Sequence, residues 1–162
     1  MQKQTKLHHS VSELGNLQLR LTTEYVKDSN VEDKKYSHPV TPADPHNMTD
    51  WDTRSQDIVS AIITPEVLAE FEAEKQIPTG IGVEEIVTFD RVIEEDGKIA
   101  VRRIIRIYDD GIEVSKKYHR SWIMPGDNLD KKDIISTVIA QKIHTPIVIA
   151  KYKDKLVKNI YI

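Results

Sequence analysis

The chain has 162 residues, contains no cysteine and carries a formal net charge of −3, with charged side chains making up 30% of it. The lack of cysteine excludes a disulfide framework and a thiolate metal site, and the slightly acidic balance argues against a protein that chiefly neutralises nucleic-acid phosphates. No apolar run reaches the roughly 18 residues of a membrane span, and the polar start lacks the apolar core of a signal peptide, so we expect no membrane partner.

The first part of the chain is typical of a three-stranded antiparallel meander. A short strand is predicted at residues 6–11. Residues 17–26 alternate apolar and polar side chains, which is the period of two that a half-buried strand requires. The sequence Asp28-Ser29-Asn30 favours a turn, after which residues 31–40 return as the third strand.

Two helices are expected to follow. Three prolines between positions 39 and 45 break the chain into a loop. Thr49 is the predicted N-cap of the first helix, because Asp50 and Asp52 would then place negative charge in its first turn. Thr64 and Pro65 begin a second helix, which is predicted to end near position 75.

The same order of elements is predicted again after a linker at residues 77–82. That linker holds one proline and two glycines, and its two isoleucines indicate that it lies against the rest of the protein. A strand at residues 83–93 leads into a long hairpin that turns at Asp110-Gly111, a strong hairpin signal. A helix from about position 130 follows, and residues 146–157 are predicted as a last helix, although their β-branched residues leave a strand open.

The two parts of the sequence match each other when it is shifted by 82 positions. Identical pairs under this shift include Gly15/Gly97, Arg20/Arg102, Asp28/Asp110, Lys34/Lys116 and Tyr36/Tyr118. A period of about 80 residues is too long for a solenoid repeat and indicates duplication of a small domain.

We therefore predict an α+β fold of two tandem repeats, each a three-stranded antiparallel meander with two helices (β-β-β-α-α). The first repeat occupies residues 1–76, the linker 77–82 and the second repeat 83–162. Two three-stranded sheets would leave exposed edges. We expect the copies to pair edge to edge, or to pack face to face, with a pseudo-two-fold relation.

No motif in the sequence predicts catalysis or cofactor binding. A glycine-rich phosphate loop, a nucleophile elbow and a paired-carboxylate motif are all absent. Five candidate metal ligands lie close together, but their spacing fits no ligand motif, and turns and helix caps account for them. These five residues are His38, Asp44, His46, Asp50 and Asp52. We expect no enzyme activity, no metal and no cofactor.

One surface of the predicted hairpin is basic. With a two-residue turn at Asp110-Gly111, Arg102 faces His119, Arg106 faces Ser115, and Lys117 lies opposite Ile104. The predicted interaction face consists of Arg102, Arg106, Tyr108, Lys117 and His119. Such a face could bind an acidic partner or a nucleic-acid backbone. Its aromatic residues are too sparse for base stacking, and a solvated surface whose charge Glu113 and other acids offset is the simpler interpretation.

Three short motifs of the second half resemble a known group of proteins. They are Tyr118-His119-Arg120, Pro125-Gly126-Asp127 and His144-Thr145-Pro146. This pattern is similar to that of small proteins encoded in the late, structural regions of tailed-phage genomes. The chain departs from it at Ile147, where Glu is usual, and the first half has Ser37-His38 in place of His-Arg. The resemblance implies a virion-associated or tail-associated role and supplies no mechanism.

The expected function is that of a phage virion structural or adaptor protein, associated with the tail or collar and made in the host cytoplasm. Its expected partners are other virion proteins and further copies of itself, arranged in a ring, with no role for nucleic acid. A non-virion soluble binding module, such as an assembly chaperone or a host-directed binder, is the alternative. Hairpin arms of about ten residues span about 33 Å, against a radius of gyration of about 12 Å for a domain of this size. The arms should therefore project and make the contacts.

Overall fold

The computed structural model describes residues 2–12, 17–27, 30–36, 52–74 and 76–160, and describes side chains for residues 8–12, 52–74 and 76–159. The strands are β1 (Gln2–Val11), β2 (Leu17–Lys27), β3 (Asn30–Tyr36), β4 (Val83–Ile93), β5 (Ile99–Asp109) and β6 (Ile112–Ile123). The helices are α1 (Thr53–Ile62), α2 (Pro65–Glu74), α3 (Ile134–Ile143) and α4 (Pro146–Ile160). The α+β class is confirmed, and the elements follow one another in the expected order.

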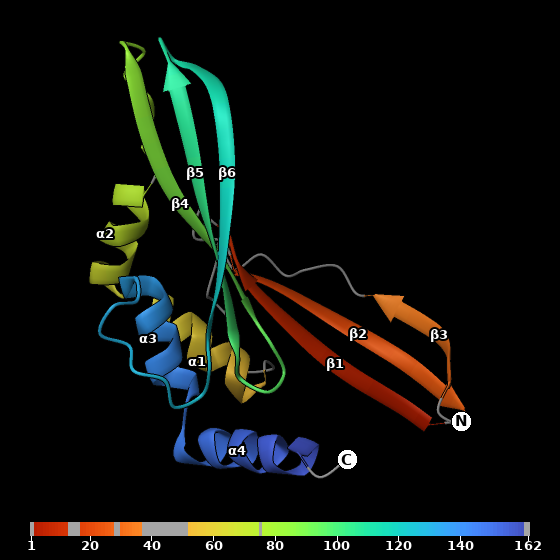
Figure 1. Ribbon diagram of the computed structural model, residues 1–162. Helices are drawn as coiled ribbons and strands as arrows, with labels where there is room; N and C mark the ends of the chain where they lie inside the picture. Colours follow the sequence, from red (N-terminus) through yellow and green to blue (C-terminus); the bar gives the residue numbers. More distant parts are fainter. Residues whose placement is uncertain (1, 13–16, 28–29, 37–51, 75, 161–162) are drawn as a thin grey trace.

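The six strands form one antiparallel sheet in the order β3-β2-β1-β4-β5-β6 (Figure 1). The two meanders join edge to edge through β1 and β4. These strands pair over three residues each, with His9 opposite Ile93 and Val11 opposite Arg91. This joint covers one edge of each meander, so β3 and β6 are the outer strands of the sheet.

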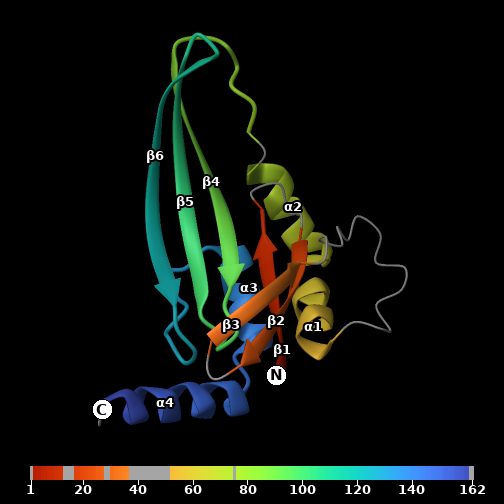
Figure 2. The ribbon, with the colours of Figure 1, turned by 90° about the vertical axis from the view of Figure 1, so that its right-hand side faces the viewer.

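Helices α1, α2 and α3 pack on one face of the sheet, as Figures 1 and 2 show together. Ile93 of β4 and Ile99 and Val101 of β5 point to this face and are buried. They meet buried side chains from the helices, among them Ile58 of α1, Phe71 of α2 and Ile139 of α3. The hydrophobic core therefore lies between the helices and the middle of the sheet.

The helix starts differ from those expected. Helix α1 begins at Thr53 and is capped by Asp52, whose carboxylate accepts a hydrogen bond from the Ser55 amide at 3.1 Å, so the prediction of Thr49 as N-cap is wrong. Helix α3 begins at Ile134 in the same way, with Asp133 accepting from the Ser136 amide at 2.8 Å. The last segment is a helix, as predicted.

Among the described residues, the ionisable side chains of Arg91 and His9 are buried in the core where the meanders join. The Arg91 side chain is fully buried. Its Nε donates to Ser136 Oγ at 3.0 Å, and its Nη2 lies 2.7 Å from Asp133 and 3.3 Å from Glu74. These partners offset the cost of removing a cation from water. Desolvation raises the pKa of Glu74 above its usual range although Arg91 attracts its carboxylate.

His9 is the neighbouring buried polar residue. Its Nε2 lies 2.8 Å from Ser55 Oγ in α1. Burial lowers the pKa of His9 from 6.5 to about 4, against the attraction of Asp52, so the imidazole is neutral at pH 7.

The β4-β5-β6 end of the sheet projects beyond the helices (Figures 1 and 2). The preceding segment, residues 76–82, contains no helix or strand and runs beside this end. Its isoleucines do not pack against the protein as expected, since Ile77 is 85% exposed. The segment is instead held by polar contacts, which include a 2.8 Å hydrogen bond from the Gly82 amide to the Asp110 carboxylate in the β5–β6 turn. The division of the chain into domains stays a prediction.

Candidate interaction surface

The predicted facing pairs of the β5–β6 hairpin are wrong by one residue. The tip follows the predicted two-residue turn, with Tyr108 opposite Glu113, but the register then shifts at a β-bulge. The pairs beyond the bulge are Arg102 with Arg120, Ile104 with Tyr118, and Arg106 with Lys116. Because side chains alternate along a strand, a shift of one residue moves every β6 side chain beyond the bulge to the face opposite the predicted one.

The bulge divides the predicted interaction face. Arg102, Arg106 and Tyr108 lie on the open face of the sheet, away from the helices, whereas Lys117 and His119 lie opposite odd-numbered residues of β5 on the other face. The residues that join the three on the open face are Lys116, Tyr118, Arg120 and Trp122. Sequence reasoning missed them because nothing in the alternating pattern of β6 marks the extra residue.

Acidic and aromatic neighbours accompany the cations of the open face. The Arg102 Nε donates to Asp90 at 2.8 Å, and Arg106 donates to Thr88 Oγ1 at 2.8 Å and lies 3.5 Å from Glu113. Glu113 therefore offsets charge, as the simpler interpretation predicts. The Tyr118 ring lies near two cations, with Arg102 5.3 Å and Lys116 5.6 Å from its centroid.

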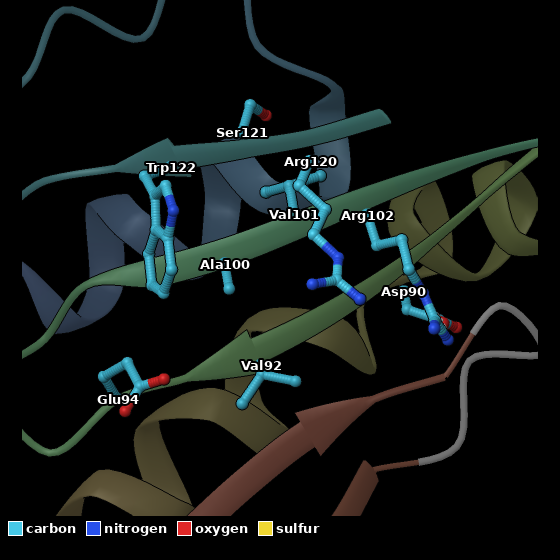
Figure 3. Close-up of a pocket in the computed structure, with 9 residues that line it drawn as sticks. All are labelled: Asp90, Val92, Glu94, Ala100, Val101, Arg102, Arg120, Ser121 and Trp122. Atoms are coloured by element: carbon cyan, nitrogen blue, oxygen red, sulfur yellow. Dashed lines mark hydrogen bonds and ion pairs between the residues drawn. The ribbon is translucent and has the colours of Figure 1, made fainter. Parts of the chain in front are cut away.

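A shallow groove of about 370 Å³ crosses this face (Figure 3). Trp122 and Glu94 lie at one end, and the Arg102–Asp90 ion pair lies at the other. The Arg120 guanidinium, which is exposed and has no hydrogen bond or ion pair with the described residues, reaches over the groove between them. The groove can accept an apolar side chain against Trp122 or a carboxylate against Arg120.

Strand β6 is the most exposed of β4, β5 and β6, the strands whose side chains are all described. Nearly all of its residues are exposed whichever face they occupy, although four of them are large and apolar. These are Ile112 (69% exposed), Val114 (59%), Tyr118 (50%) and Trp122 (43%). An edge strand with free backbone groups and apolar side chains is a template for another strand.

Two of the short motifs of the second half lie against the turn between β4 and β5. Gly97 lies in the β4–β5 turn with φ 89°, and a Cβ atom there would lie 2.8 Å from Val148 and 3.3 Å from Pro125. The His144 ring bonds the Gly97 carbonyl at 2.8 Å, and Asp127 accepts from the Met124 amide at 2.8 Å. The Pro-Gly-Asp and His-Thr-Pro motifs thus hold the end of β6 and the start of α4 against one turn.

A group of Asp52, Ser55 and His9 has the composition of a catalytic triad but not its geometry. Ser55 Oγ donates to the Asp52 carboxylate, so the His9 Nε2–H must donate to Ser55 rather than accept its proton. A serine nucleophile needs the reverse arrangement. Both Ser55 and His9 are also buried from any substrate. The hydrogen bonds of this group stabilise the joint between α1 and β1.

Of the five candidate metal ligands, His38, Asp44, His46 and Asp50 lie outside the described residues. Asp52 is the N-cap of α1. Within the part of the chain that the structure describes, no three His, Asp or Glu side chains are grouped as metal ligands would be.

Comparisons with protein-family models, with curated proteins and with solved structures found no match. Among the described residues, no helix combines the length and apolar character needed to cross a bilayer.

Proposed function

We propose that this chain is a structural adaptor that works by protein–protein contact through β6 and the projecting end of the sheet. The observation that carries the proposal is the exposure of β6 on both faces and along its outer edge, with apolar side chains at both ends. A strand with no such role is expected to be short, covered or free of exposed apolar residues.

Hydrogen bonds order the projecting end before any partner arrives. Glu84 accepts from the Thr79 amide at 3.1 Å, from the Thr79 hydroxyl at 2.9 Å and from the Gly80 amide at 3.2 Å. Asp110 bonds Gly82 through both its carboxylate and its amide. A surface that is already ordered loses less conformational entropy on binding.

A duplicated β-β-β-α-α unit is the architecture that we propose for this adaptor. The pair Gln2 and Val26 of β1–β2 corresponds, 82 positions later, to the pair Glu84 and Tyr108 of β4–β5. The bulge follows the same shift, since the register changes opposite Tyr25 and Val26 of β2 and opposite Ile107 and Tyr108 of β5. Equal registers and equal bulges are expected of two copies of one unit and are not required by a six-stranded sheet.

We propose that the adaptor acts in the phage virion. This proposal rests on the three short sequence motifs of the second half. Other virion proteins are the proposed partners. Mass spectrometry of purified phage particles tests it. We expect the chain in particles, at a fixed copy number, and its absence would overturn the virion role. Detection only in complexes with unassembled virion proteins would favour an assembly chaperone instead.

The contact surface is tested by a variant that keeps β propensity. Replacing Ile112 and Val114 by Thr removes exposed apolar surface from β6, and we expect a folded protein whose incorporation into particles falls at least about tenfold. The matched control is Ile147→Thr on α4, which is also a large exposed residue (67%) and should leave incorporation unchanged. Normal incorporation of the β6 variant would exclude this end of β6 as the contact.

A further inference from the structure

The charges of the β5–β6 hairpin are separated along its length. Asp109, Asp110 and Glu113 lie at the turn, whereas Lys116, Lys117 and Arg120 follow along β6. Neither Lys117 nor Arg120 has an ion-pair partner among the described residues, and both are exposed. The β5–β6 hairpin therefore has an acidic turn and a basic stem, the latter on the outer strand β6.

From this arrangement we propose that two copies of the chain pair through β6, antiparallel and about a two-fold axis. Antiparallel pairing places the acidic turn of each copy beside the basic stem of the other, so the complementary contact occurs twice. Parallel pairing would place acid beside acid and base beside base. The second copy is the occupant that the charge pattern of the β5–β6 hairpin selects.

The apolar side chains of β6 fit the same arrangement. Ile112 and Val114 lie near the turn, and Tyr118 and Trp122 lie on the stem. Antiparallel pairing brings a second β6 beside Tyr118 and Trp122 on the open face and beside Ile112 on the other face. Pairing would remove apolar surface of both copies from contact with water, which favours the dimer.

The chain already contains one joint of this kind. Strands β1 and β4 unite the two meanders by antiparallel pairing of their edges. A second such joint at β6 would extend two sheets of six strands into one continuous sheet, and β3 would be the remaining outer strand of each copy. Covering β6 would also remove an exposed edge that invites uncontrolled aggregation.

Light scattering after size exclusion tests the pairing. The wild-type protein is used at about 100 µM, a concentration high enough to populate a dimer whose Kd is in the micromolar range. We expect a dimer at low ionic strength that dissociates as salt is added, because exposed ion pairs are screened. The stem variant Lys117→Glu/Arg120→Glu should dissociate at least about tenfold more readily. The turn variant Asp109→Lys/Glu113→Lys should do the same. A wild-type monomer, or an unchanged dimer in the stem variant, would overturn the proposal.

Combining the charge changes tests the antiparallel direction. The variant with all four changes has a basic turn and an acidic stem, so antiparallel pairs are complementary again and we expect the dimer to return. An equimolar mixture of the stem and turn variants should form a mixed dimer for the same reason. Failure of the four-change variant to dimerise, when circular dichroism shows that it is folded, would overturn the antiparallel arrangement.

A matched control separates this effect from net charge. Lys151→Glu/Lys153→Glu makes the same change in charge on exposed residues of α4 and should leave the dimer intact. Equal loss in this control would overturn the assignment to β6. Particle incorporation is measured separately, so a monomeric protein that still enters particles would contradict the self-pairing without contradicting the adaptor function.

Discussion

Ser10 pairs directly with Val92 where β1 meets β4, and these two residues are separated by the same 82 positions at which the two halves of the sequence match. The flanking pairs, His9 with Ile93 and Val11 with Arg91, exchange places under that shift. A two-fold axis relating the halves would therefore pass through the Ser10–Val92 pair. This is the relation expected after the fusion of a self-complementary dimer, and it supports the proposed duplication.

Removing the buried cation should destabilise the joint between the halves. We expect Arg91→Met to lower the free energy of unfolding by about 3–5 kcal/mol, because Asp133 and Glu74 would keep their desolvated carboxylates without a counter-charge. Urea denaturation at pH 7, followed by circular dichroism, measures the loss. Adding Glu74→Gln and Asp133→Asn to this variant should recover most of it, since Asn still caps a helix. A loss below about 1 kcal/mol in the single variant would contradict the role given to Arg91.

His9 should make stability depend on pH in a defined window. Its pKa is about 4 in the folded protein and 6.5 when unfolded, so between these values the unfolded chain binds a proton that the folded chain does not. Its contribution is fully present above pH 6.5 and is lost as the pH falls to about 4, a change of about 3 kcal/mol. The groups that act on it are Asp52, which opposes the shift, and Arg54 and His8, which reinforce it.

His9→Gln should remove this component. Urea midpoints measured from pH 4 to pH 8 should rise less steeply in the variant than in wild type. A smaller slope should remain, because burial also lowers the pKa of His144. Parallel curves for the two proteins would mean that His9 is accessible to protons in the folded state.

Gly97 should tolerate no side chain. We expect Gly97→Ala to cost more than about 2 kcal/mol, since φ 89° strains an L-residue and the new Cβ would lie 2.8 Å from Val148. Gly82→Ala is the control. Its φ of 68° is also positive but nothing lies within 4 Å of its Cβ, so only the strain of about 1–2 kcal/mol remains. If the steric contact is decisive, Gly97→Ala combined with Val148→Ala will cost less than the sum of the two single changes.

Glu84 should control the order of the projecting end. We expect Glu84→Ala to speed amide hydrogen exchange at Thr79 and Gly80, which donate to its carboxylate. The same hydrogen bonds lower the pKa of Glu84, so protonation at low pH should loosen these amides in wild type as well. Glu85→Ala, one residue later and on the other face, should leave both exchange rates unchanged.

The order of elements could be predicted from alternation and turn signals, and the bounds of β4 were predicted correctly. The residues of the open face could not be predicted, because no glycine, proline or other turn residue marks the bulge in β6 and the alternating pattern continues through it. Val114, the extra residue at the bulge, has the same apolar character as its neighbours in an alternating strand. The burial of Arg91 and His9 was also missed, since a polar residue in an alternating strand predicts a solvent-facing position until its partners on α1, α2 and α3 are known.

His9 and Arg91 occupy corresponding positions, 82 residues apart, and each hydrogen-bonds a serine three residues beyond a helix cap. In a dimer of identical chains both positions would hold one residue type, so two arginines would confine two like charges within a single core. Under the proposed duplication, joining the copies in one polypeptide releases that constraint, because each position then mutates independently. One half could then keep a cation compensated by acids, as at Arg91, while the other acquired a neutral imidazole, as at His9. The two corresponding positions would therefore have evolved separately.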